Sequence, residues 1–77
     1  MASPLQQIYF DQLISRVRAD KFPSHQLLDR IEASFWTSDQ IAEYVAALLQ
    51  KLDESRYPSH QILDRIERML LITSAAA

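Results

Sequence analysis

The sequence contains no cysteine, no glycine and no asparagine. The absence of cysteine excludes disulfide bonds, thiolate zinc sites and cysteine nucleophiles. A secreted domain of 77 residues would ordinarily need such cross-links, so we expect a reducing, cytoplasmic location. Glycine and asparagine are the residues that most readily adopt the left-handed backbone of tight hairpin turns. A β-rich fold is hard to close without them, and the composition therefore predicts an all-α protein.

Long apolar runs and an excess of one charge are missing as well. No apolar run approaches the length of a transmembrane helix, and the N-terminus lacks the basic-then-apolar pattern of a signal peptide. Eight basic and ten acidic residues are interspersed and give a net charge of −2, which disfavours binding to nucleic acid or to an anionic membrane. Apolar residues make up 48% of the chain, enough for a core. Residues 1–77 are expected to form one helical domain.

Four helix-start signals are present. Ser3 with Gln6, and Thr37 with Gln40, have the spacing of capping boxes, and Ser24 and Ser59 each follow a proline. Together with apolar residues at three-and-four spacing, they predict helices over 4–19, 24–36, 39–53 and 59–73, followed by a frayed tail at 73–77. The apolar stripe predicted for the first helix comprises Leu5, Ile8, Tyr9, Leu13, Ile14 and Val17.

A shift of 35 residues aligns the first half of the chain with the second without a gap. KFPSHQLLDRIE at 21–32 then matches RYPSHQILDRIE at 56–67. The repeat units are 3–36 and 38–71, and each predicts one helix-turn-helix hairpin. A lone hairpin cannot bury its apolar stripe, so we expect two tandem hairpins packed into a compact, four-helix bundle-like domain. The marker positions of helical solenoid repeats are absent, and the sequence indicates no known family.

The second helices of the two units agree at nearly all of their first nine positions, whereas the first helices share little beyond core residues. On a helix, positions i, i+4 and i+7 lie along one side. Two polar stripes therefore flank the apolar seam in each unit. The first unit contributes His25, Asp29 and Glu32, leading to Trp36, with Gln26 and Arg30 opposite; the second contributes His60, Asp64 and Glu67, leading to Leu71, with Gln61 and Arg65 opposite.

Three interpretations of these stripes are open. In the first they tie the hairpins together, and the repeat is a partial duplication. In the second they form an outward-facing surface that docks a protein partner. In the third the His-x3-Asp-x2-Glu pattern binds a metal, which is the weakest interpretation because the several inward carboxylates and the Glu-x-x-His pairs of bundle metal sites are missing. We expect no metal, no cofactor, and neutral histidines that form local hydrogen bonds.

Catalysis is not indicated. Ser24 and His25 are adjacent, but neighbouring helical residues point about 100° apart, and helix capping already explains the serine. The chain also lacks a glycine-rich phosphate loop. We therefore do not expect an enzyme.

The surplus of apolar residues around Trp36 and in the run 69–72 suggests either an interface or closure of the bundle end. The favoured function is a non-catalytic adaptor, regulator or inhibitor that docks a protein through the repeated second helices, with a homodimer as a further expectation. The alternative is a small nucleic-acid-binding regulator that uses the basic residues Arg16, Arg18 and Lys21 at the end of the first hairpin.

Overall fold

A computed structural model describes residues 3–34, 37–55 and 59–76, and these residues form four helices and no strand. The helices are α1 (Pro4–Ala19), α2 (His25–Glu32), α3 (Ser38–Glu54) and α4 (His60–Ala76). The prediction of an all-α, four-helix domain is confirmed. Within the described ranges, no helix is both long enough and apolar enough to cross a membrane.

The helices begin where the sequence predicted, because the caps are local. Ser3 and Thr37 each accept a hydrogen bond from the N–H group three residues on, and Gln6 and Gln40 complete the two capping boxes. The Oγ atom of Ser24 accepts from the Leu27 N–H at 3.1 Å, and Ser59 caps α4 in the same way. Each cap satisfies a backbone donor that the first helical turn leaves without an intrahelical partner.

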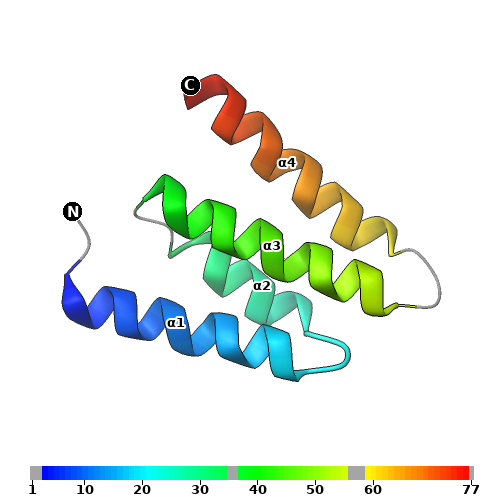
Figure 1. The fold of residues 1–77 in the computed structure, drawn as a ribbon, viewed down its shortest axis with the longest axis horizontal. Coiled ribbons are helices and arrows are strands. Elements are labelled where there is room, and N and C mark those ends of the chain that lie inside the picture. Colours follow the sequence, from blue (N-terminus) through cyan, green and yellow to red (C-terminus); the bar gives the residue numbers. More distant parts are fainter. Residues whose placement is uncertain (1–2, 35–36, 56–58, 77) are drawn as a thin grey trace.

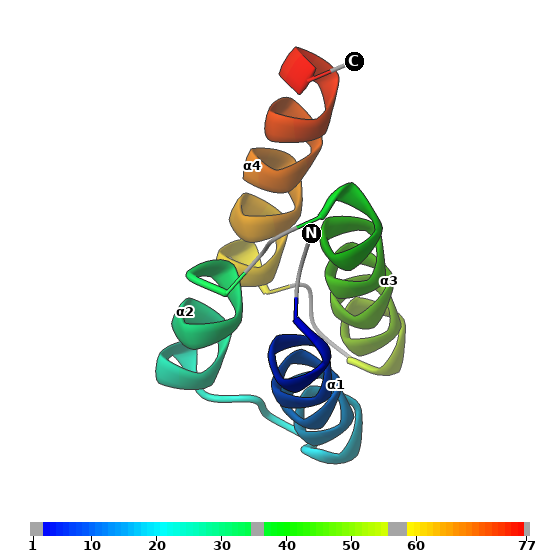
Figure 2. The same cartoon turned by 90° about the vertical axis from the view of Figure 1, so that its left-hand side faces the viewer.

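Two hairpins lie side by side (Figure 1). We call α1 and α2 unit 1, and α3 and α4 unit 2. The units meet where α1 packs along α3, while α4 packs on α3 and diverges from the other helices toward its C-terminal end. Figure 2, which looks along the helices, shows α2 and α4 on the same side of the α1–α3 pair. The first helices of the two units, α1 and α3, therefore form one layer, and the second helices, α2 and α4, lie on one side of it.

One contiguous core holds the hairpins together. Its buried residues are Phe10, Ile14, Val17, Leu28, Ile31, Tyr44, Ala47, Leu48, Ile62, Ile66 and Met69. The stripe predicted for α1 is partly wrong, because Leu5, Ile8 and Tyr9 are exposed and Phe10 is fully buried. The helix is turned so that Phe10, Ile14 and Val17 face inward. That stripe has the same helical spacing as the predicted one, so periodicity alone could not choose between them.

Two helix ends differ from the prediction. Helix α2 ends at Glu32 instead of residue 36. Just beyond this end, the Ser34 hydroxyl donates to the Arg30 carbonyl and the Ser34 N–H donates to the Ile31 carbonyl. Trp36, a predicted anchor, lies outside the described residues. Helix α4 continues through Ala76 instead of fraying after residue 73, consistent with the high helix propensity of alanine.

Repeat-equivalent positions have different surroundings in the two units. Tyr9 is 48% exposed, whereas Tyr44 is fully buried. Arg30 is exposed, whereas Arg65 is only 8% exposed. Helix α2 has 8 residues and α4 has 17. The repeat is evident in the sequence, but as a structural unit it stays a prediction.

Candidate functional site

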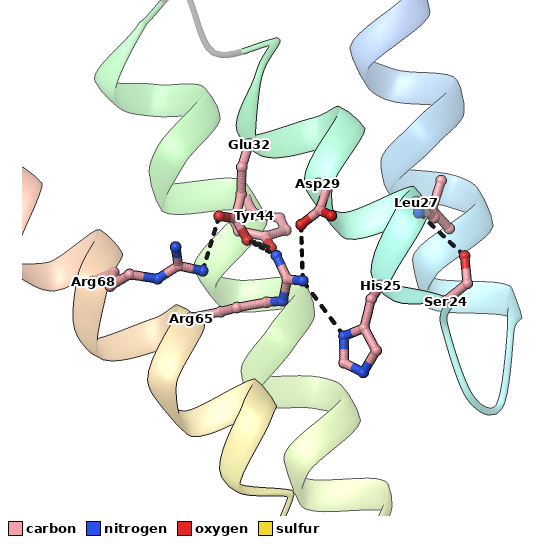
Figure 3. Close-up of polar contacts among 8 residues, drawn as sticks. All are labelled: Ser24, His25, Leu27, Asp29, Glu32, Tyr44, Arg65 and Arg68. Carbon is pink, nitrogen blue, oxygen red and sulfur yellow. Dashed lines mark hydrogen bonds and ion pairs between the residues drawn. The ribbon is translucent and has the colours of Figure 1, made fainter.

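The repeated polar residues meet at the place where α4 approaches α2 (Figure 3). Arg65 extends from α4 toward α2, and its guanidinium is surrounded by His25, Asp29 and Glu32. We call these four residues, with Tyr44 and Arg68, the Arg65 cluster. The first polar stripe of unit 1 is therefore occupied by an arginine from unit 2.

Glu32 is the most heavily bonded acceptor of the cluster. One carboxylate oxygen accepts from Arg65 and from the Tyr44 hydroxyl, the latter at 2.5 Å. The other oxygen accepts from Arg68 at 3.2 Å. Side chains from α3 and α4 thus converge on one carboxylate of α2 and connect these three helices.

Arg65 makes two further contacts. It pairs with Asp29 at 2.9 Å and lies 3.4 Å from the Nδ1 atom of His25. A guanidinium can only donate hydrogen bonds, so the Nδ1 atom of His25 takes the acceptor side of this contact. We expected the histidines to bond locally, and for His25 this is wrong because its contact lies on another helix.

The two most buried charges of the cluster, Arg65 and Glu32, compensate each other, while Asp29 and Arg68 pair with them from the exposed rim. Burial would lower the pKa of Arg65, but the hydrogen bonds that its guanidinium donates to the Glu32 and Asp29 carboxylates outweigh this effect and raise that pKa. Two arginines face two carboxylates, and in the described part of the chain every buried side-chain polar atom has a hydrogen-bond partner. Such a set is stable only while all its members are present.

Tyr44 gives the cluster a predicted dependence on pH. Burial raises the pKa of Tyr44 well above its usual value, and its bond to the negatively charged Glu32 raises it further. An unfolded tyrosine loses its proton near pH 10. Above that pH the unfolded chain therefore binds fewer protons than the folded chain, and the free energy of unfolding falls as pH rises.

We expect this loss to disappear in the Tyr44→Phe variant. Above about pH 10, the free energy of unfolding of the wild type should fall by up to about 1.4 kcal/mol per pH unit relative to the variant. Urea unfolding of both proteins on either side of pH 10 measures the difference. If the two pH profiles run parallel, Tyr44 does not keep its proton in the folded protein.

The remaining predicted partner-binding residues are on the surface. Gln26 and Arg30 are exposed on α2. Five of the predicted residues are exposed on α4, namely His60, Gln61, Asp64, Glu67 and Leu71. A shallow hollow of about 650 Å³ runs along α4. Its lining comprises His25, Gln61, Asp64, Arg65, Glu67, Arg68 and Leu71. Of the two predicted polar stripes, the one on α2 (His25, Asp29 and Glu32) therefore binds Arg65. Its copy on α4 (His60, Asp64 and Glu67) faces solvent.

Two of the three basic residues at the end of the first hairpin contact other side chains of the protein. Arg18 donates to Gln50 on α3, and the Lys21 ammonium lies 5.7 Å from the centre of the Phe22 ring. Arg16, Arg18 and Lys21 are all exposed.

Sequence reasoning missed two members of the Arg65 cluster. Tyr44 lies at helical spacing with the apolar residues Ile41 and Leu48, and this position gives no sign that its hydroxyl meets a carboxylate. Arg68 has no repeat equivalent, because Ala33 occupies that position. Among the described residues no group of three or more acidic or histidine side chains could hold a metal ion. In the α2 stripe, the Arg65 guanidinium already occupies the space between the three side chains.

Comparison of this chain with protein-family models, with curated proteins and with solved structures found no match. The functional assignment therefore depends on the geometry of the residues themselves.

Proposed function

We propose that this chain is a non-catalytic protein-binding module whose docking face is the outer side of α4. One observation supports this most strongly. The stripe His60–Asp64–Glu67 has the same residue types and spacing as the stripe that holds Arg65, but its glutamate, Glu67, is exposed, whereas the side chain of Glu32 is only 14% exposed beneath Arg65. A surface built like an arginine acceptor, but without its arginine, fits a partner that presents a cationic side chain.

The character of the hollow on α4 favours a protein partner over a small molecule. Small-molecule sites are usually concave and mostly apolar. This hollow is shallow and lined mainly by charged or amide side chains, with Leu71 as its apolar residue at 70% exposure. A polar rim beside an apolar anchor is the arrangement found in protein interfaces.

The contacts of Ser24 and His25 support a non-catalytic role. The Ser24 hydroxyl accepts the capping bond from the Leu27 N–H, and the Nδ1 atom of His25 faces Arg65. Neither contact is the nucleophile-to-base hydrogen bond by which a catalytic serine and histidine are recognised.

The proposal predicts that charge reversal on α4 abolishes partner binding without unfolding the protein. Immobilised wild-type chain and an Asp64→Arg/Glu67→Arg variant would be compared for capture of proteins from a cell extract, followed by calorimetry with the purified partner. We expect the variant to bind at least about tenfold more weakly, because an acceptor becomes a repulsive cation. Glu43→Arg is the matched control, since Glu43 is an exposed acidic residue on α3.

Equal binding by the wild type and the α4 variant would contradict the proposal. Salt-sensitive retention on DNA or heparin, lost when Arg16, Arg18 and Lys21 are neutralised, would instead favour the nucleic-acid alternative.

A further inference from the structure

The two units meet near α2 through residues of unit 2 whose repeat equivalents in unit 1 face outward. Unit 2 contributes Tyr44 and Arg65 to this junction, and both contact Glu32 of unit 1. A shift of 35 residues converts these two into Tyr9 and Arg30, which are exposed on unit 1. Unit 1 therefore carries, on its free side, the same two side chains with which unit 2 fills the acceptor stripe.

The acceptor has a free copy as well. His25, Asp29 and Glu32 receive Arg65 within the chain, and their equivalents His60, Asp64 and Glu67 are exposed on α4. The molecule thus has an unused donor face on unit 1 and an unused acceptor face on unit 2.

The first-helix side of the junction follows the same rule. Within the chain, the Lys51 ammonium donates to the main-chain carbonyl of Arg18 at 2.7 Å. The equivalents of these residues are Arg16 and Asp53, both exposed. The free face of unit 1 therefore carries a cation, Arg16, at the position of Lys51, and the free face of unit 2 carries the Asp53 carbonyl with an acidic side chain on the same residue.

Two polar residues that contact each other at the junction have apolar residues as their repeat equivalents on the two free faces. Gln40 of α3 donates to Gln7 of α1 at 2.9 Å. In their places stand Leu5, which is 77% exposed, and Ala42. Similarly, the buried Ile14 of α1 corresponds to Leu49 of α3, which is 49% exposed. The free face of α1 and the free face of α3 are therefore both apolar at these positions, so they could pack against each other.

We propose that the partner docked by α4 is a second copy of this chain, bound head to tail. Unit 1 of one copy would pack on unit 2 of the next as unit 2 packs on unit 1 within the chain. Arg30 and Tyr9 of the second copy would enter the His60–Asp64–Glu67 stripe, Arg16 would meet Asp53, and Leu5 and Tyr9 would cover Leu49. The inference rests on the proposed function, because it names the partner of the same α4 face.

Two features define the assembly. The contact is heterologous, since different faces of the two copies meet, so it repeats along a stack or closes into a ring. It is also weaker than the junction within the chain, because Ala33 stands where Arg68 would supply the third donor to the carboxylate. We therefore expect association that depends on protein concentration.

Complementary variants test the inference. Arg30→Ala removes the donor face, and Asp64→Ala/Glu67→Ala removes the acceptor face, while each variant keeps the opposite face intact. Sedimentation and light scattering should show wild-type assemblies that grow beyond dimers as concentration rises. Each variant alone should associate at least about tenfold more weakly. An equimolar mixture should form one-to-one dimers and nothing larger, because each complex joins the two intact faces.

Glu43→Ala serves as the control, because Glu43 is exposed but lies about a third of a turn from Leu49 around α3. This variant should assemble as the wild type does, and circular dichroism should show that all the variants are folded. A folded wild type that stays monomeric, or that stops at a dimer, overturns the inference. If such a protein still loses another partner on charge reversal at α4, the proposed function stands and only the identity of the partner is wrong.

Discussion

Replacement of Arg65 by alanine is expected to lower the free energy of unfolding by about 3 kcal/mol, close to the whole stability available to so small a domain. The loss follows from the burial of Glu32, whose side chain is only 14% exposed. Without the guanidinium, this carboxylate keeps the Tyr44 hydroxyl and Arg68 but loses its most buried cationic partner. Denaturant unfolding followed by circular dichroism measures the effect.

The repeat supplies a matched control for this experiment. Arg30 is the same residue in nearly the same local sequence, but it is exposed, so Arg30→Ala should change the free energy of unfolding by no more than about 0.5 kcal/mol. Arg65→Lys should fall between the two alanine variants, because lysine keeps the charge but loses the planar, two-pronged geometry. Equal losses in Arg30→Ala and Arg65→Ala would show that the two arginines occupy equivalent sites, contrary to the structure.

Replacement of Phe10 by alanine should be at least as damaging, with an expected loss of about 3–4 kcal/mol. Phe10 is fully buried and lies on the inward face of α1 with Ile14 and Val17. Its removal forfeits the transfer free energy of a phenyl ring and leaves a cavity that the short helices cannot fill. We expect most of the variant to be unfolded at room temperature, which thermal melts would reveal.

Tyr9→Ala is the matched control for α1. The neighbouring Tyr9 is 48% exposed, and its removal should cost less than about 1 kcal/mol. The comparison is made at low concentration, where the proposed self-association is absent. If Tyr9→Ala were instead the more destabilising change, α1 would present to the core the stripe that its periodicity first suggested.

The predictable part of the fold depends on interactions between near neighbours in the chain. Ser3 with Gln6 and Thr37 with Gln40 place two helix starts because a capping box needs only residues three apart. The absence of glycine and asparagine pointed to helices because it limits backbone conformations locally. These features, with Ser24 and Ser59 as the caps of the other two helices, specified the all-α class and the four helix starts to within one residue before any tertiary contact was known.

The outward direction of each polar stripe could not be predicted in the same way. Arg30 and Arg65 occupy equivalent places in nearly identical dodecamers, yet one is exposed and the other lies inside a cluster of carboxylates. Tyr9 and Tyr44 differ in the same manner. For the two arginines, no rule that depends on neighbouring residues can separate the exposed one from the buried one, because their local sequences are nearly the same.

The amino-acid sequence by itself therefore determined the helices, their caps and the doubling of the polar stripes. The tertiary structure decided which copy of each stripe is filled and which is left open. The physical reason is that two stacked units share a single junction, so each unit buries one side against the other and leaves the opposite side exposed to solvent.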